Sequence, residues 1–341
     1  MQQIGKEFKI LCIDGGGIKG LYSATILKHF EEKFNCRISD HFDMLCGTST
    51  GGLIALGLSL KIPASELVNF YVEKGPKIFP DLSSNWFLKA YGIFRQTLWK
   101  GKFDDIELKK ALEGVFGNRK IGESNNLLCI PSYTITEAKP WIFKFDHKEG
   151  NLSRDNNTLY VDVALATTAA PTYFPVSEIE NENFKQFIDG GVWANNPTLV
   201  GYIEALKNFV GEGKEFDYLS ILSLSSLSIT GGKKTGISRK RPFIKWRDEL
   251  FETSMTGQSK FSEFFMDNIV DLTHIKVKYV RIPSAVIASQ QEGNIQLDVA
   301  STNALNLIKG KGRDQGLLFE KKSEIAEFFK EKKHFNISKN G

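Results

Sequence analysis

Short apolar runs alternate along the chain with longer segments in which apolar residues recur every three or four positions. FKILCIDGGG, residues 8–17, is a β-rich apolar run that ends in glycines, which predicts a buried strand and then a tight turn. Residues 18–35 repeat apolar positions with a helical period. HFDMLCGTS, residues 41–49, predicts a second strand, and TGGLIALGLSL, residues 50–60, a second helix. This order predicts an α/β fold with a mostly parallel sheet covered on both faces.

Later segments continue the same alternation. Further strands are expected over 126–135, 184–193 and 216–227, and further helices over 158–170 and 196–210. After residue 227 a Gly- and Lys-rich stretch opens a more charged part that we expect to be mainly helical. The sequence therefore predicts a motif-bearing core over residues 9–205. Residues 206–341 are expected to supply the remaining sheet edge and a helical extension with a regulatory role.

Two glycine-rich loops follow the first two predicted strands. DGGGIKG, residues 14–20, satisfies the dinucleotide-binding pattern G-x-G-x-x-G, and a nucleotide-binding regulatory protein is the alternative function that we keep. Asp14 counts against that interpretation, because it would place a carboxylate at the mouth of a pyrophosphate site. The other loop, GTSTG, places Ser49 between two glycines, which is typical of a nucleophile elbow. Loops after neighbouring parallel strands leave the sheet at one edge, so we expect both loops to face one crevice.

A nucleophilic serine needs a base, and the histidines are poor candidates for one. His29 and His41 precede the serine, His147 lies in a polar turn, and His274 and His334 lie in charged segments. Asp189 is the strongest acidic candidate. It ends the apolar run FKQFID and is followed by two glycines, which repeats the pattern of the other two loops.

The ordered loops DGGGIKG, GTSTG and DGG together resemble the patatin-like phospholipases over roughly residues 9–205. AAPTYFP, residues 169–175, and NNP, residues 195–197, also resemble family positions that shape the active-site wall. The resemblance implies a three-layer α/β/α sandwich and a Ser-Asp dyad, with Ser49 as nucleophile and Asp189 as base. It also implies an oxyanion hole formed by the backbone N–H groups of Gly15, Gly16 and Gly17. The positions that it implies as supporting the dyad are Lys19, Gly47, Gly51, Gly190 and Gly191.

Two positions depart from the family pattern. Lys19 stands where many members carry arginine, so the charge is kept but the planar fork is lost. SILSLSSLS, residues 220–228, lacks the Gly-Thr-Gly that often follows the Ser-Leu of this family.

A dyad places a demand on the acid. A free aspartate, with a pKa near 3.9, is a poor base, so we expect an apolar setting that raises the pKa of Asp189. Phe184, Phe187 and Trp193 are the candidates for that setting. The sequence shows no cluster with metal-ligand spacing, so we expect neither a metal nor a cofactor.

Composition and charge bear on the class of protein and on its cellular compartment. Hydrophobic residues make up 41% of the chain, which is an ordinary globular composition. The net charge is only +4, so any attraction to anions must come from a local cluster of basic residues. The four cysteines form no C-x-x-C pair and are expected to be reduced core thiols. The N-terminal apolar run is too short for a secretory signal, and no stretch approaches a membrane span. We therefore expect a cytoplasmic protein.

Two segments suggest where a lipid or an activator acts. Residues 85–100 predict an amphipathic helix with tryptophan and basic residues, either interfacial or packed on the core. Residues 231–247 hold seven basic residues and no acidic one. We expect this basic patch either to bind lipid headgroups or nucleotide phosphates, or to be a solvated loop. The candidate anion-binding residues in it are Lys233, Lys234, Arg239, Lys240 and Arg241.

The expected partner is a phospholipid membrane, which the active enzyme contacts peripherally. The resemblance extends to anti-phage effectors that cyclic nucleotides switch on, so a cyclic nucleotide is the expected activator. No nucleic-acid polymer is expected to bind. A monomer and a homo-oligomer both remain open.

Overall fold

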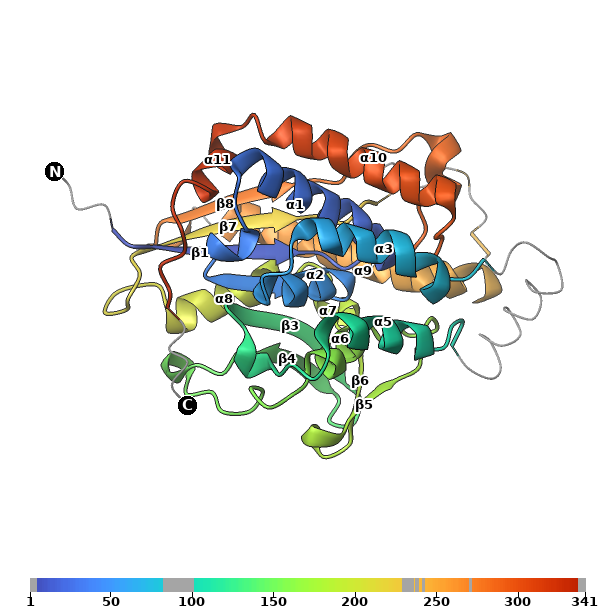
Figure 1. Cartoon of the computed structure of the whole chain (residues 1–341), viewed down its shortest axis with the longest axis horizontal. Helices are drawn as coiled ribbons and strands as arrows, with labels where there is room; N and C mark the ends of the chain where they lie inside the picture. The colour runs from blue at the N-terminus through green and yellow to red at the C-terminus, as the bar shows by residue number, and fades with distance from the viewer. Residues whose placement is uncertain are drawn as a thin grey trace.

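The computed structural model describes residues 5–81, 101–228, 236, 239–240, 243–269 and 272–336. Its centre is an eight-stranded sheet in the order β5-β6-β3-β2-β1-β7-β8, with β4 paired to β3 (Figure 1). The strands are β1 (Glu7–Ile13), β2 (Met44–Gly47), β3 (Leu127–Thr134), β4 (Lys139–Lys144), β5 (Ser177–Ile179), β6 (Lys185–Asp189), β7 (Tyr218–Leu224) and β8 (Val277–Ile282).

The five neighbouring strands β3, β2, β1, β7 and β8 are parallel, whereas β4, β5 and β6 enter through antiparallel pairings. The predicted mostly parallel sheet is confirmed. The sequence did not indicate β4 or β8, and β8 lies in the part that we expected to be mainly helical.

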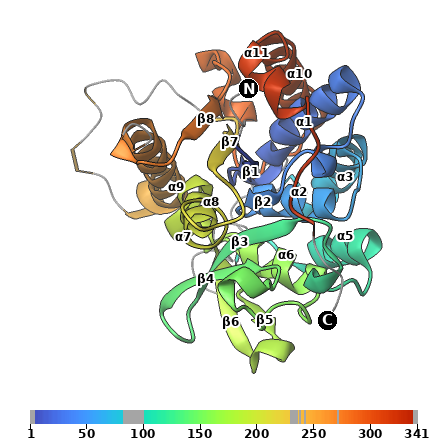
Figure 2. The ribbon, with the colours of Figure 1, turned by 90° about the vertical axis from the view of Figure 1, so that its left-hand side faces the viewer.

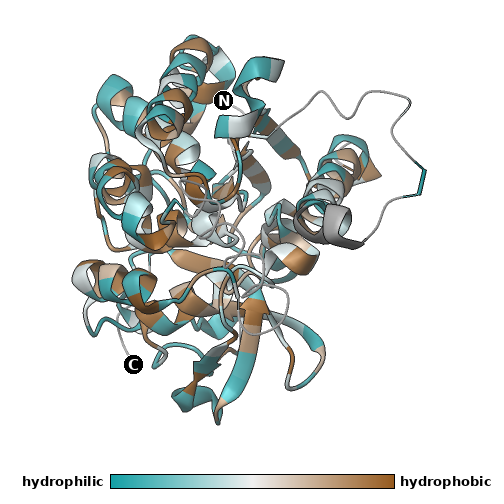
Figure 3. Ribbon diagram, turned by 90° about the vertical axis from the view of Figure 1, so that its right-hand side faces the viewer, coloured by the Kyte–Doolittle hydropathy of each residue, from teal (hydrophilic) through white to brown (hydrophobic). Residues whose placement is uncertain are grey.

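Helices cover both faces of the sheet and complete the predicted three-layer sandwich. Figure 2 shows α7, α8 and α9 on one face and α1, α2, α3 and α10 on the other. The helices are α1 (Gly20–Phe34), α2 (Thr50–Ser59), α3 (Ala64–Ile78), α5 (Ile106–Phe116), α6 (Tyr160–Thr168), α7 (Gly191–Ala194), α8 (Thr198–Asn208), α9 (Phe243–Ile269), α10 (Thr302–Phe319) and α11 (Ser323–Phe328). Figure 3 shows hydrophilic and hydrophobic positions side by side along the outer helices, as expected for helices with one buried face. None of the helices in the described ranges is both long and apolar enough to cross a bilayer.

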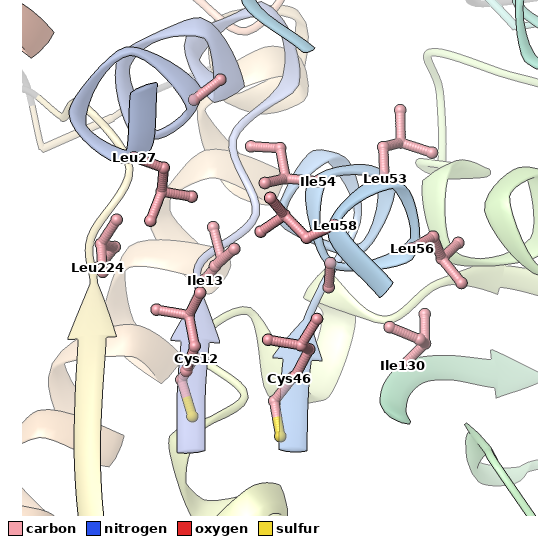
Figure 4. Close-up of a cluster of buried hydrophobic side chains, with 14 of the residues drawn as sticks. Cys12, Ile13, Leu27, Cys46, Leu53, Ile54, Leu56, Leu58, Ile130 and Leu224 are labelled. Atoms are coloured by element: carbon pink, nitrogen blue, oxygen red, sulfur yellow. The ribbon is translucent and has the colours of Figure 1, made fainter. Parts of the chain in front are cut away.

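Helix α2 is buried along its whole length, which explains its small and apolar sequence. Its Ile54 and Leu58 pack above β1 and β2 (Figure 4). Cys12 and Cys46 are register partners on those strands, Cys129 of β3 follows in the same row, and all three are buried free thiols. The prediction of unpaired core cysteines is therefore confirmed for these three residues.

The chain after α11 is tied to the far end of the sheet by a buried carboxylate. Asp43 Oδ1 accepts the backbone N–H groups of His334 at 2.8 Å and Phe335 at 2.7 Å. Its Oδ2 accepts the N–H of Lys9 at 2.7 Å. The Lys9 ammonium, also buried, donates to the carbonyl of Glu331 at 2.5 Å. We call residues 329–336 the C-terminal segment; it joins the starts of β1 and β2.

Candidate active site

Ser49 lies on a sharp turn between β2 and α2. Its φ of 53° and ψ of −126° are rare for a residue with a side chain, as in a nucleophile elbow. The glycines around it allow close backbone approach. A Cβ on Gly47 would lie 2.2 Å from the carbonyl oxygen of Gly51, and a Cβ on Gly51 would lie 2.2 Å from that of Ile13. The GTSTG pattern is thus explained by packing of the turn against β1.

The elbow points the serine at Asp189. Ser49 Oγ donates to Asp189 Oδ2 at 2.6 Å, and the two residues are only 6% and 1% exposed. Asp189 Oδ1 accepts the N–H of Gly191 at 2.6 Å, which fixes the carboxylate plane. Strand β6 runs antiparallel to β3, with Asp189 opposite Ser132. The aspartate therefore reaches the serine from an antiparallel strand, not from a third parallel one.

Burial raises the pKa of Asp189 to about 7, although the hydrogen bonds from Ser49 and Gly191 favour the carboxylate. Of the three aromatic residues expected around the acid, Phe187 is fully buried on the same strand and Trp193 is partly buried, but Phe184 is not part of the setting. Phe184 is 61% exposed and does not shield the acid. Instead Met255 of α9 lies beside it, with its sulfur 3.1 Å from the position of a Cβ on Gly191, and both Met255 and Asp189 line one cavity.

Thr167, which sequence reasoning missed, holds the serine backbone. The Ser49 N–H donates to Thr167 Oγ1 at 3.0 Å, and that hydroxyl donates to the carbonyl of Pro131 at 2.6 Å. Thr167 lies in the predicted helix over 158–170, but no local pattern distinguishes it from its neighbours.

The first glycine loop borders the same site. The Gly15 N–H donates to the carbonyl of Asn195 at 3.0 Å. By contrast, the N–H groups of Gly16 and Gly17 make no hydrogen bond with any described residue. Gly17 has a φ of 59°, and a Cβ there would lie 2.1 Å from the carbonyl oxygen of Leu297. Packing on Leu297 therefore leaves room only for glycine at position 17.

Asp14, at the start of this loop, is held by Arg281 of β8. The pair is bidentate, with Nη1–Oδ1 and Nη2–Oδ2 distances of 2.9 and 2.6 Å. Both side chains are buried, so the pair anchors the loop to the edge of the sheet.

An apolar cavity of about 50 Å³ opens onto the dyad. Ser49 and Asp189 lie in its wall beside Gly16 and Gly17. The remaining wall is mostly aliphatic and aromatic, and includes Leu53, Phe70, Ile78, Phe79, Phe174 and Phe251. This lining suits a fatty acyl chain better than a polar substrate.

None of the five histidines, all of which lie in the described ranges, hydrogen-bonds to the dyad. His29 contacts Glu320, His41 contacts the carbonyl of Glu331, and His147 contacts Glu204.

Comparisons with known proteins agree with this geometry. A family model described as patatin-like phospholipase matches residues 11–202. A cGAMP-activated phospholipase of Pseudomonas aeruginosa is 32% identical over 305 residues, which cover 89% of this chain and 86% of the relative. A cGAMP-activated phospholipase of Vibrio cholerae is 29% identical, with 96% of both chains covered.

The chain belongs to the patatin-like phospholipase family. It is accordingly a lipid hydrolase, as the three loops predicted. Among solved structures, VipD from Legionella pneumophila aligns with a TM-score of 0.41 and 12% identity, over 92% of this chain and 66% of that one.

The remaining predicted residues of this patatin-like chain are dispersed. Gly190 packs on Pro131, and a Cβ there would lie 2.3 Å from the Pro131 carbonyl oxygen. Lys19 is 8% exposed and lines a second cavity, not the one at the dyad. Arg239 and Lys240 are exposed. The rest of the basic patch, Lys233, Lys234 and Arg241, and the helix predicted over 85–100 lie outside the described residues.

Proposed function

We propose that this patatin-like chain hydrolyses the fatty acyl esters of membrane phospholipids with a Ser49–Asp189 dyad. The supporting observation is the 2.6 Å hydrogen bond from Ser49 Oγ to an aspartate whose pKa burial raises to about 7. A carboxylate with that pKa accepts a proton near neutral pH far better than a free aspartate.

In the first half-reaction, Ser49 Oγ attacks the ester carbonyl carbon and its proton passes to Asp189 Oδ2. The tetrahedral intermediate places its negative oxygen near the free N–H groups of Gly16 and Gly17. Gly15, whose N–H is engaged by Asn195, acts by positioning the loop. Collapse of the intermediate breaks the ester C–O bond, and the departing alcohol takes the proton from Asp189.

In the second half-reaction, Asp189 removes a proton from water, which attacks the acyl-enzyme. The fatty acid leaves and Ser49 regains its proton. During both steps the part of the acyl chain next to the carbonyl lies in the apolar cavity, where burial of each methylene contributes about 0.8 kcal/mol to binding.

We further propose that a cyclic nucleotide activates the enzyme, in anti-phage defence, because the Pseudomonas and Vibrio relatives are both named cGAMP-activated phospholipases. A cytoplasmic phospholipase that acts on membranes needs such control. Peripheral membrane contact is supported by the outer face of α9, where Phe261 and Phe264 are 58% and 67% exposed.

The test is hydrolysis of mixed phospholipid vesicles, with released fatty acids measured by mass spectrometry with and without cGAMP. Wild-type chain should release fatty acid, more so with cGAMP, whereas Ser49→Ala should release none. Thr48→Ser, which keeps the hydroxyl that donates to the carbonyl of Ala194, is the matched control and should stay active. Undiminished release by Ser49→Ala would refute the dyad.

A further inference from the structure

A second cavity, of about 560 Å³, adjoins the first across the glycine loop. Three residues, Gly16, Met255 and Leu297, line both cavities, but Ser49 and Asp189 line only the smaller one. The larger cavity is walled by the loop after β1, by residues 225–228 after β7 and by one side of α9. Its volume lies within the roughly 300–1,000 Å³ typical of small-molecule sites.

Several buried polar atoms of this cavity have no partner among the described residues. Ser225 Oγ, Ser226 Oγ and Arg281 Nε are all buried without a hydrogen bond, and both serines are only 8% exposed. An unpaired buried polar atom costs about 1–3 kcal/mol. Several together in one cavity indicate a site shaped for a polar occupant.

The lining of this cavity carries both a basic and acidic side chains, which would suit a ligand that has both an anionic group and hydrogen-bond donors. The Lys19 side chain is buried and forms no hydrogen bond or ion pair with any described residue. Burial lowers the pKa of Lys19, and an anion bound beside it would favour the ammonium. Glu252 and Glu292 lie in the same wall, and their carboxylates are acceptors for amino or hydroxyl groups of a ligand. Lys260 is paired with Glu263, and Arg281 with Asp14, so these charges cancel locally.

We infer that this polar cavity binds the activating nucleotide, with a phosphate at Lys19 and amino or hydroxyl groups at the carboxylates of Glu252 and Glu292. Phosphate, ribose hydroxyls and base amino groups together match the ammonium, the hydroxyl-rich wall and the acids. The inference rests on the proposed activation by a cyclic nucleotide and adds its location.

The polar cavity shares a wall with the glycine loop of the proposed active site. A Cβ on Gly16 would lie 1.9 Å from Ser226 Oγ, so the wall of the polar cavity touches the loop that carries the free N–H groups. A ligand that binds better when Ser226 and Gly16 stand in the catalytic arrangement would stabilise that arrangement. Occupancy would thus set the position of the oxyanion donors without contacting substrate.

The first experiment measures cGAMP binding by calorimetry to full-length Ser49→Ala protein, in which no turnover occurs. Thr253→Trp places an indole into the cavity from α9 and should raise the Kd at least tenfold. Ser254→Trp, the next residue on the same helix and outside the lining, should leave the Kd unchanged.

Glu252→Gln is a second variant that keeps the shape and should also raise the Kd, while Asp267→Asn, elsewhere on α9, should not. Thermal unfolding of each variant checks that it is folded. In hydrogen exchange, cGAMP should slow exchange of residues 14–20 in the Ser49→Ala protein but not when Thr253→Trp is added.

Two results would overturn the inference. One is absence of cGAMP binding to the Ser49→Ala protein; ester hydrolysis by wild type then still tests the enzyme separately. The other is binding that survives both cavity variants and is lost when Arg239 and Lys240 become glutamine, which would place the ligand on the basic patch.

Discussion

At the residue scale, the proposed chemistry depends on one carboxylate in an environment that disfavours its charge. Asp189 keeps its proton to about pH 7 because burial outweighs two hydrogen bonds to the ionised form. That single property affects the rate, the stability and the pH range of the enzyme, and each effect can be measured.

The rate of hydrolysis of a soluble ester should rise with pH through about 7, because only ionised Asp189 accepts the serine proton. Below pH 6, kcat/KM should fall about tenfold per unit. The measurement is a profile from pH 5 to 9 at constant ionic strength. A flat profile would contradict Asp189 as the base.

The same raised pKa lowers stability at neutral pH. Between the ordinary value of 3.8 and about 7, the folded chain holds a proton that the unfolded chain has lost, so the free energy of unfolding falls as pH rises. Asp189→Asn should therefore be more stable than wild type at pH 8, by up to about 4 kcal/mol, and equally stable near pH 4. Urea unfolding at both pH values measures this, and lower stability of the variant at pH 8 would refute it. Its hydrolysis rate should fall about 10²- to 10⁴-fold.

Gly16→Ala should reduce kcat with little change in KM, because the new Cβ would press on Ser226 and displace the oxyanion donors. The double variant Gly16→Ala/Ser226→Gly removes the colliding side chain and should recover part of the rate. Steady-state kinetics on a soluble ester measure both. An unchanged kcat in the single variant would show that these N–H groups do not act in catalysis.

At the element scale, the strands and helices around the site could be predicted because each has a clear period and ends in a distinctive loop. The helices predicted over 50–60 and 158–170 correspond to α2 and α6. Strand β8 was missed although VKYVRI is rich in β-branched and aromatic residues, because the charged and otherwise helical composition around it dominated the expectation for this part of the chain. As an edge strand it needs only one packed face, which leaves a weaker signal.

The residues of the site also divide into those that the sequence indicated and those that it did not. Ser49 and Asp189 could be identified because glycine loops mark them, whereas Met255 and Arg281 reach the site from distant segments. Met255 is one apolar residue on a 27-residue helix, and nothing in its neighbours indicates contact with Asp189. Such contacts depend on how elements pack, which a sequence period does not specify.

Asp43 should be among the most sensitive buried positions away from the site. Asp43→Ala leaves three buried N–H groups, those of Lys9, His334 and Phe335, without their acceptor. We expect a loss of roughly 3 kcal/mol or more in the free energy of unfolding. Asp40→Ala, which removes a partly exposed ion pair with Lys61, is the control and should cost under about 1 kcal/mol. Equal midpoints in urea for the two variants would contradict the role of Asp43.

At the scale of the whole molecule, α9 is one element by which the C-terminal part contacts the site in the core. Phe251 and Met255 close the acyl cavity, while Glu252 and Thr253 face the polar one. A shift of this single helix would change both cavities together. The division into a core over 9–205 and an extension over 206–341 stays a prediction. Helix α9, from the second part, lines the cavity that holds Ser49 and Asp189 of the first.

Hydrolysis of a soluble ester should be unaffected by a chelator such as EDTA. In the described part of the chain, no group of three or more His, Cys, Asp or Glu side chains could hold a metal ion. In the proposed mechanism the dyad and the two free N–H groups supply base, nucleophile and charge stabilisation. Loss of rate in EDTA, restored by one divalent ion, would contradict this prediction.

The anchoring of the C-terminal segment also affects how the protein is made. Asp43 emerges from the ribosome 291 positions before His334, which at usual synthesis rates is a wait of roughly 15 to 60 s. Throughout that interval Asp43 lacks two of its three donors, the N–H groups of His334 and Phe335. A nascent chain is therefore incompletely folded while it is still attached to the translation machinery. A hydrolase of this design gains this contact only after residues 329–336 have been made, which delays any attack on the lipids of the cell that makes it.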